Sequence, residues 1–340
     1  MFNKKRGQVE LQFNWIFIFI VGVIILGIGI NIIPKLQTTS EQSVSIDLQA
    51  HLDGMISSIQ YDLDAQNSFN LYGQEIYFNC NSYELKNSEV MSASIENSII
   101  FSPNVIQDDL LGFSKLIEQP NKFAYASFLT SPEIKYVLVK SSESEILLNE
   151  LPNNIDKSLS TNINNIKKSG YYKLKIVTFK NIPSAQDLSA DIGDENITLI
   201  KIDVLNDKDK FPNSFGVVSF YKKNNNNFEL TKESYFFDKA TLVGAIYSEN
   251  QEMHMCNLQK SIKKLYLILK IKLDRATNFS TTPELKHCPY DESIQKINQL
   301  IDDTKEPNDT KQYFENIYLQ SEGIELENVM LKRLSCPLLY

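Results

Sequence analysis

Two short runs of side chains that can bind metal or change redox state lie on either side of a long predicted helix. Met253-His254-Met255-Cys256 opens this helix, and His287-Cys288 follows it. Two histidines and two cysteines suit a tetrahedral zinc site, and the methionine thioethers add a soft-metal alternative. A site formed by His254, Cys256, His287 and Cys288 requires the loop from Asn278 to His287 to double back along the helix, and ten residues can span that distance.

The same cysteines have a second possible chemistry, because the chain contains four cysteines: Cys80, Cys256, Cys288 and Cys336. Outside the cytoplasm, an even number of cysteines favours disulfides over a metal site. Four cysteines allow three pairings, and proximity in sequence alone favours Cys256 with Cys288. We therefore expect two disulfides, with a metal site as the alternative.

A serine-rich loop is a candidate ligand site. Ser141-Ser142-Glu143-Ser144 follows a buried strand predicted at Lys135–Val139. Open α/β sheets bind ligands at the carboxyl ends of their strands. The loop resembles the metal-adhesion loop of von Willebrand A domains, with Lys140 at the position of that loop's leading aspartate. Ser141, Ser142 and Ser144 are the candidate ligand residues, and an ordinary strand-to-helix turn is the alternative.

Motifs of several enzyme classes are missing from the sequence. It has no glycine-rich phosphate loop, no Gly-x-Ser-x-Gly and no His-Glu-x-x-His. The three histidines, His51, His254 and His287, lack a recognisable sequence partner for a Ser-His-Asp triad. We predict a protein without catalytic activity and without a cofactor. A metal-dependent enzyme using His254 and His287 is the alternative.

The first elements that position these residues are the predicted strands of a sheet. Short strands are predicted at 75–80 and 98–102, where extended runs are bounded by polar turn residues. Lys135–Val139, a helix over Glu145–Ile166 and Lys173–Phe179 form one βαβ unit, so its two strands should be parallel. Further strands are predicted at 197–204, 215–221 and 228–236. The polar turn Asn224–Asn227 makes the last two a hairpin, so the sheet should be mixed.

Beyond residue 250 the pattern becomes helical. Helices are predicted at 255–277, 291–304 and 311–334. In the first, apolar residues recur at a three- or four-residue spacing that predicts a core stripe of Leu258, Ile262, Leu265 and Leu269. The lysines of this helix fall mostly on other faces, and we interpret them as a solvated surface: Lys260, Lys263, Lys264 and Lys272.

The N-terminal part predicts a membrane anchor. Nineteen residues from Trp15 to Ile33 carry no formal charge, which is enough to span a bilayer core. Ile33-Pro34-Lys35 offers no signal-peptidase site. Since Lys4, Lys5 and Arg6 precede the span, the N-terminus should be cytoplasmic and the rest extracellular. A stalk helix should follow at 38–66, with one apolar face formed by Val44, Leu48, Leu52, Met55, Ile59 and Leu63.

The segment Lys4-Lys5-Arg6-Gly7-Gln8-Val9-Glu10-Leu11-Gln12-Phe13 resembles the class III signal of archaeal type IV pilins. The resemblance implies that a membrane peptidase cuts after Gly7 and leaves Gln8 as the new N-terminus. The fifth mature residue is Gln12, where the family has an acidic residue that guides filament packing. Glu10 occupies the third position instead.

Other segments resemble uncharacterised single-pass proteins of small-genome archaea. They are Gln12–Trp15, Phe128–Tyr136, Gly244–Ser248 with Cys256-Asn257, and Cys336–Tyr340. This resemblance implies a topology and no activity.

Charge and composition limit the partners. Outside the cytoplasmic segment and the anchor, 31 basic residues face 41 acidic ones, which argues against nucleic acid or anionic lipid headgroups as the partner of the outer region. The predicted α+β or α/β chain consists of a cytoplasmic segment (1–14), a transmembrane helix (15–33), the stalk (38–66), a mixed α/β domain (70–245) and a helical subdomain (250–340). We expect contact with the bilayer and with other envelope proteins, in a structural, adhesive or binding role. A minor pilin-like subunit is the alternative.

Overall fold

The computed structural model describes residues 19, 21–23, 26, 49–59, 66–86, 92–118, 122–163, 166, 170–185, 188, 193–206 and 208–339. The chain divides into two compact units, one of residues 1–51 and 87–91 and one of residues 52–86 and 92–340. In the first unit the described residues, at 19, 21–23, 26 and 49–51, are helical. All strands and the helices α2 to α6 belong to the second unit.

Much of the predicted N-terminal organisation lies outside the described residues. This applies to segment 1–14 with its processing site Gly7-Gln8, to most of the predicted span 15–33, and to residues 38–48 and 60–65 of the predicted stalk. Among the residues that the structure describes, no helix is both long and apolar enough to cross a membrane.

Sheet A is a six-stranded, mainly antiparallel sheet with the order β3-β2-β1-β5-β6-β4. Only β4 and β6 run parallel. The predicted strands at 75–80 and 98–102 overlap β1 and β4, whereas the longer strands β5 and β6 were not predicted. The strand bounds are β1 Gln66–Phe78, β2 Ser82–Leu85, β3 Ser92–Ser94, β4 Ile100–Phe101, β5 Val105–Ile117 and β6 Ala124–Thr130.

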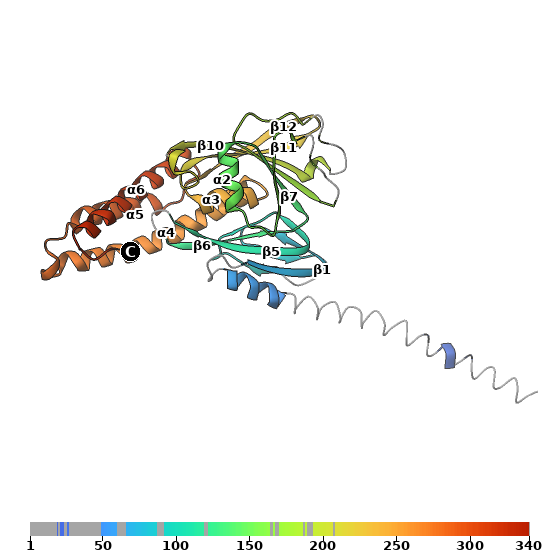
Figure 1. Ribbon diagram of the computed structural model, residues 1–340. Coiled ribbons are helices and arrows are strands. Elements are labelled where there is room, and N and C mark those ends of the chain that lie inside the picture. Colours follow the sequence, from blue (N-terminus) through green and yellow to red (C-terminus); the bar gives the residue numbers. More distant parts are fainter. Residues whose placement is uncertain are drawn as a thin grey trace, which may run out of the picture. The chain divides into compact units, whose positions relative to one another are not determined.

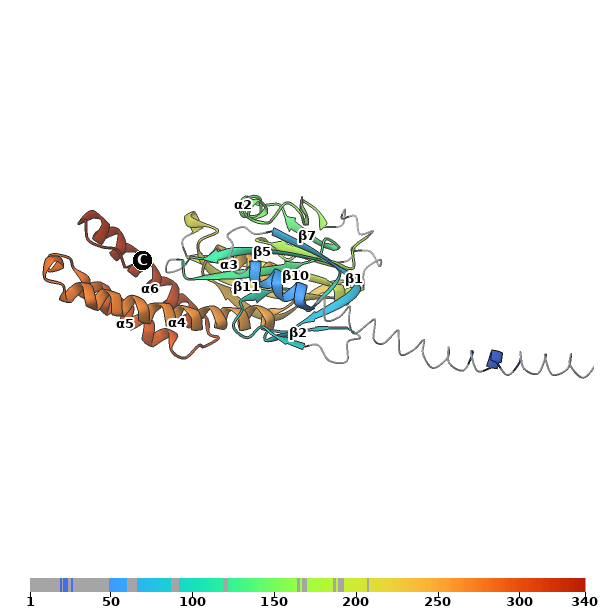
Figure 2. The same ribbon diagram turned by 90° about the horizontal axis from the view of Figure 1, so that it is seen from below.

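A short helix covers one face of sheet A, as the stalk pattern predicts for its described part. Residues 52–59 are helical, and Leu52, Met55 and Ile59 are buried (Figure 2, blue). They lie over β5 at Gly112, where a Cβ atom would collide with Ile59. The phenol of Tyr83 on β2 donates to the Asp53 carboxylate at 2.7 Å. The predicted apolar positions Val44, Leu48 and Leu63 lie outside the described residues.

Sheet B is mixed, as predicted, with the order β12-β11-β10-β9-β7-β8, but the strands predicted at 75–80 and 98–102 belong to the separate sheet A and not to this sheet. Strands β8, β7, β9 and β10 run parallel, while β11 and β12 form the predicted antiparallel hairpin. The bounds are β7 Ile134–Val139, β8 Asp156–Ser160, β9 Lys173–Thr178, β10 Ile197–Asn206, β11 Phe215–Asn224 and β12 Asn227–Phe236.

The βαβ prediction is correct for the parallel pair β7 and β9 but wrong for the segment between them. The helix α2 covers only Ser142–Glu150, and the edge strand β8 occupies residues that the prediction assigns to the helix. Pro152 explains the early end, because proline lacks the amide hydrogen that a continuing helix needs.

The helix α3, Lys239–Tyr247, occupies the centre of the second unit. It contacts β5 and β6 of sheet A and β12 of sheet B (Figure 1), and every residue from Ala240 to Tyr247 is buried. A reciprocal pair of hydrogen bonds between Asp238 and Thr241 caps its N-terminus. An added Cβ at Gly244 would lie 2.8 Å from the Phe101 ring, so the helix approaches sheet A closely. The core therefore has three layers, with α3 and the start of the following helix between the two sheets.

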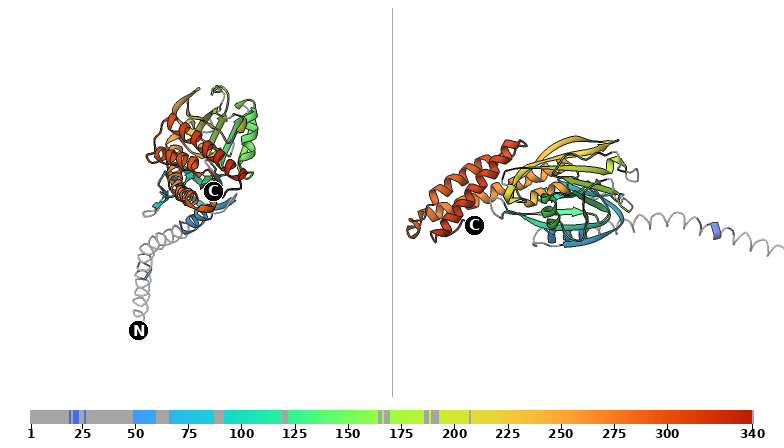
Figure 3. Two further views of the ribbon diagram at one scale, coloured as in Figure 1. Left: turned by 90° about the vertical axis from the view of Figure 1, so that its left-hand side faces the viewer. Right: turned by 45° about the horizontal axis from the view of Figure 1, so that its top comes forward.

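The predicted C-terminal helices are present as α4 Gln251–Thr281, α5 Tyr290–Thr304 and α6 Lys311–Arg333, with the short 3₁₀ helix η4, Pro283–Leu285, after α4. The predicted stripe Leu258, Ile262, Leu265 and Leu269 is fully buried. The start of α4 contacts β4, β6 and β12, whereas its outer half packs against α5. Figure 3 shows this outer half extending beyond the sheets beside α5 and α6. Residues 266–339 are called the arm below, and the remainder of the unit the body.

Candidate functional site

The four cysteines form two disulfides in the structure. Cys80, just after β1, is bonded to Cys256 near the start of α4, with their Cα atoms 6.2 Å apart. Cys288 is bonded to Cys336, with their Cα atoms 5.9 Å apart, which joins the end of the α4–α5 connection to the chain just after α6. The described cysteines include no free thiol.

The predicted pairing of Cys256 with Cys288 is wrong, and the length of α4 explains why. The helix continues to Thr281, four residues beyond the predicted end. Cys256 therefore lies about 38 Å from Thr281 along the axis. Seven further residues reach back at most about 25 Å. A disulfide needs Cα atoms closer than about 7 Å, so these two cysteines cannot meet.

The predicted metal set is likewise not assembled. His254 is fully buried, with its Nδ1 atom 2.7 Å from the Ser234 hydroxyl and its Nε2 atom 2.9 Å from the Thr241 carbonyl oxygen. Since a carbonyl only accepts, Nε2 carries the hydrogen and Ser234 donates to Nδ1. Burial lowers the pKa of His254 to about 4. This neutral imidazole links α4 to α3 and β12.

His287 lies at the other end of α4, exposed, beside the sulfur atoms of Cys288 and Cys336. Because those sulfur atoms are bonded to each other, His287 is the only one of the three residues with a free ligand atom. The continuous helix also separates His254 from His287 by well over 10 Å. The structure therefore separates the four residues His254, Cys256, His287 and Cys288 into two regions.

The three serines of the candidate ligand loop form a helix cap. Ser141 is the N-cap of α2 and accepts from the Ser144 amide at 3.1 Å, while the Ser144 hydroxyl donates to the Val139 carbonyl at 2.6 Å. The Ser142 hydroxyl donates to Glu143. A groove of about 620 Å³ at the ends of β9 and β10 is lined by Glu143, Phe179 and Phe211 among others, and the three serines are not part of its lining. In this structure the three serines form a strand-to-helix turn that caps α2.

A fully buried lysine, Lys175 on β9, was not anticipated from the sequence. Its ammonium donates to the carbonyl oxygens of Ile246, Tyr247 and Ser248 at 3.2, 2.8 and 2.7 Å. These carbonyls lie at the C-terminus of α3, where a helix lacks internal donors and favours a cation. Burial lowers the pKa of Lys175 to about 7. Since its three donors point at three carbonyls, Lys175 caps α3 and presents no amine to a substrate.

A buried ion pair flanks this lysine. The ammonium of Lys173 lies 2.6 Å from the carboxylate of Glu249, and both side chains are nearly enclosed. Burial alone would raise the pKa of Glu249, but the ammonium groups of Lys175 and Lys173 together hold it below its usual value. The only sequence signal for this cluster was the presence of lysines within a predicted strand, Lys173-Leu-Lys-Ile176. The pattern of a strand does not indicate which residue will pair with such a lysine.

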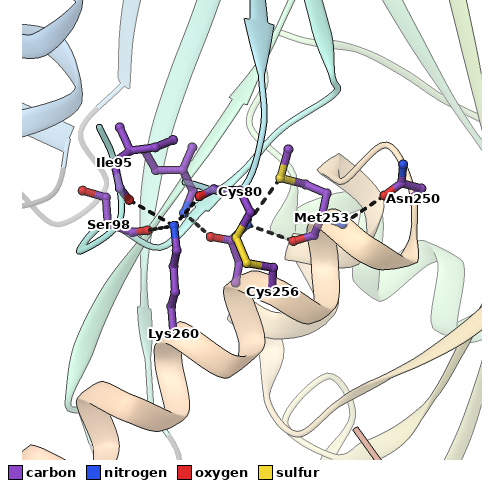
Figure 4. The surroundings of a disulfide bond; sticks show 9 residues. Cys80, Ile95, Ser98, Asn250, Met253, Cys256 and Lys260 are labelled. Atoms are coloured by element: carbon purple, nitrogen blue, oxygen red, sulfur yellow. Dashed lines mark hydrogen bonds between the residues drawn. A yellow bond between two sulfur atoms is a disulfide. The ribbon is translucent and has the colours of Figure 1, made fainter. Parts of the chain in front are cut away.

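The interpretation of the α4 lysines as a solvated face is wrong for Lys260 and Lys272, which are 8% and 7% exposed. Lys260 donates to the carbonyl oxygens of Cys80, Ile95 (3.0 Å) and Ser98 (3.2 Å) (Figure 4). Burial lowers its pKa to about 8. A helical wheel assigns one buried face to α4, but this part of the helix is packed by sheet A as well as by sheet B.

The Cys80–Cys256 bridge borders two grooves of opposite charge. The groove called basic here has a volume of about 500 Å³ and is lined by Asn81, Glu96, Asn97, Cys256, Gln259, Lys260, Lys263, Lys264 and Leu267. The groove called acidic has about 630 Å³, contains Glu84 and Glu252, and is bordered by both Cys80 and Cys256. This partly exposed disulfide between charged grooves is the candidate functional site.

Comparison of the chain with protein-family models, with curated proteins and with solved structures gives no match.

Proposed function

We propose that this chain is a membrane-anchored extracytoplasmic protein with a structural, adhesive or binding role at the cell envelope. The observation that carries the proposal is that two disulfides use all four cysteines. Disulfides of this kind persist in oxidising compartments and are rare in the cytosol. The apolar run from Trp15 to Ile33 is long enough to anchor the chain, and Lys4, Lys5 and Arg6 favour a cytoplasmic N-terminus.

The surface of the arm supports a binding role. Apolar side chains of α4 and α6 are exposed by 43 to 64%: Leu267, Ile271, Leu319, Leu326, Val329 and Met330. Leu319, Leu326 and Met330 are spaced by seven and four residues, so they share one helical face. The opposite face of α6 is buried. We assign the contact with a partner protein to the exposed face of α6 that carries Leu319, Leu326 and Met330.

The anchor and its orientation are tested in intact cells. We expect the full chain to resist carbonate extraction from membranes. We also expect protease added outside intact cells to degrade the arm. The matched control carries Ile24→Arg and Ile28→Arg within the apolar run and should become extractable. Recovery of the unaltered chain in the soluble fraction, or protection of the arm from protease, would contradict the proposal.

The binding surface is tested by placing a photo-reactive amino acid at Leu326 in the full chain. The matched control position is Leu230 on β12, a leucine of similar exposure at 52% against 64%. We expect a cross-linked protein from position 326 and none from position 230. Equal yields at the two positions would remove the arm as the contact surface.

The boundary Arg6-Gly7-Gln8 favours a second candidate, a minor type IV pilin-like subunit. N-terminal sequencing of protein isolated from its native membrane distinguishes the two. Gln8 as the first residue supports the pilin-like subunit, whereas an N-terminus at Met1 or Phe2 excludes processing at this boundary.

A further inference from the structure

The two disulfides differ in accessibility. Cys288 and Cys336 are only 7% and 5% exposed. Cys80 and Cys256 are half-buried, and Cys256 borders both the basic and the acidic groove. A dissolved reagent can therefore approach the Cys80–Cys256 bridge through a groove of several hundred cubic ångströms, whereas the arm bridge is packed within its surroundings.

The charges beside the accessible bridge favour one class of reagent. In the basic groove, three ammonium groups, those of Lys260, Lys263 and Lys264, face one carboxylate, that of Glu96. Burial lowers the pKa of Lys260 and also that of Lys264, because both ammonium groups are less solvated than those of exposed lysines. Cations next to a cysteine stabilise its thiolate and attract anions.

Hydrogen bonds also hold the segment around Cys80 against α4, independently of the disulfide. Lys260 donates to Cys80 itself and to Ile95 and Ser98 in the connection between β3 and β4 (Figure 4). One turn of α4 earlier, Asn257 accepts from the Ile100 amide at 2.9 Å. These bonds join the same segments of sheet A to α4 without involving sulfur. The bridge can therefore open while the surrounding backbone keeps its position.

We propose that the Cys80–Cys256 bridge is a thiol–disulfide exchange site that takes anionic thiols through the basic groove. An incoming thiolate attacks the sulfur of Cys256, the bond between the two protein sulfurs breaks, and the sulfur of Cys80 leaves as a thiolate. The product is a mixed disulfide on Cys256. One sulfur–sulfur bond replaces another, so the step needs no oxidant beyond the bridge itself. The proposal does not depend on the membrane anchor.

The test uses the full chain with both bridges oxidised and two probes, glutathione as the anionic thiol and cysteamine as the cationic thiol. They are compared at equal thiolate concentration, and adducts are located by mass spectrometry after acid quenching. We expect the glutathione adduct on Cys256 to form about tenfold faster than the cysteamine adduct, because of charge attraction. Cys288 and Cys336 should remain bonded to each other throughout.

The lysines are tested with Lys263→Gln combined with Lys264→Gln, which leaves Lys260 and its carbonyl contacts in place. This variant should lose most of the preference for glutathione. The matched control Lys270→Gln alters another exposed lysine of α4 that is not part of the groove lining and should keep the preference. For the unaltered chain, 1 M salt should also reduce the preference by screening the charges.

Three results would each overturn the proposal: equal rates for the two thiols, equal reaction at the Cys288–Cys336 bridge, or a preference that survives both the double substitution and high salt. The salt measurement uses the unaltered chain, so the proposal stays testable if the double variant folds poorly. Loss of the near-ultraviolet circular dichroism signal when Cys256 is modified would contradict the claim that the bridge opens without unfolding.

Discussion

The helices α3 in the body and α6 in the arm are both apolar on more than one face, but they differ in what covers them. Sheet A and sheet B enclose α3, so that no residue from Ala240 to Tyr247 is exposed. In α6, one face is buried while Leu326 on another is 64% exposed. The body buries the apolar side chains of α3 completely, whereas the arm leaves some apolar side chains of α6 in contact with water or with a partner.

Each region contains one disulfide and at least one buried lysine, and the two regions differ in the contacts that these groups make. In the body, buried cations bind backbone carbonyls: Lys175 those at the end of α3, and Lys260 those around Cys80. In the arm, the covalent bond between Cys288 and Cys336 connects the outer end of the α4–α5 turn to the end of α6.

The largest effect that we expect follows from Lys175→Met in the body. The substitution keeps the volume but leaves three α3 carbonyls without their donor and removes a cation near Glu249. Loss of one partner in a buried polar network typically costs about 3–5 kcal/mol. Urea denaturation of the chain should show this loss, with Lys263→Gln as an exposed-lysine control. A change below about 1 kcal/mol would mean that the carbonyls find other donors.

The next effect concerns the arm. The double substitution Cys288→Ser and Cys336→Ser opens a loop with a sequence separation of 48 residues, for which the chain-entropy model gives about 4 kcal/mol. We expect the loss to be local, so that hydrogen exchange accelerates in the last turns of α6 while β9 and β10 keep their protection. Equal acceleration in the body would show that the arm and the body unfold as one unit.

Acid should weaken the body through His254. Its pKa is about 4 in the folded chain, below the ordinary value of 6.5, because burial disfavours the charged form. Between these values the unfolded chain binds a proton that the folded chain does not, so stability falls as the pH decreases from about 6.5 to 4, by about 3 kcal/mol. Denaturation across this range in His254→Gln should show a smaller slope. An identical slope would place the acid sensitivity elsewhere.

The smallest effect distinguishes the two faces of α6. Leu326→Ala should change the free energy of unfolding by no more than about 0.5 kcal/mol, since the side chain is 64% exposed. Ile324→Ala, two residues away and fully buried, should cost about 2–4 kcal/mol. Thermal unfolding of the two variants provides the measurement. Comparable losses would show that Leu326 is covered in solution, for example by a second copy of the chain.

The sequence predicts the periodic elements of this protein well, because hydrophobic spacing depends on local geometry. The stripe from Leu258 to Leu269 and the hairpin around Asn224–Asn227 follow from such patterns. The parallel pairing of β7 with β9 follows from the crossover rule, although the connecting helix is shorter than predicted. The helix α3 has no such signal, because a helix that is covered on every side shows no polar face. Likewise β8 is an edge strand of half-buried residues and has no distinct pattern of its own.

The candidate site depended on the tertiary structure. Composition and spacing predict disulfides, but the pairing of Cys80 with Cys256 follows from where the β1–β2 turn meets α4, 176 residues away in sequence. Lys260 and Lys175 are ordinary charged residues in the sequence, and only the carbonyls that distant segments bring to them make their burial possible. Local periodicity determines which segments are helices or strands, whereas long-range packing decides which sulfur, ammonium and carbonyl groups meet, since no local rule encodes the path of the chain between them.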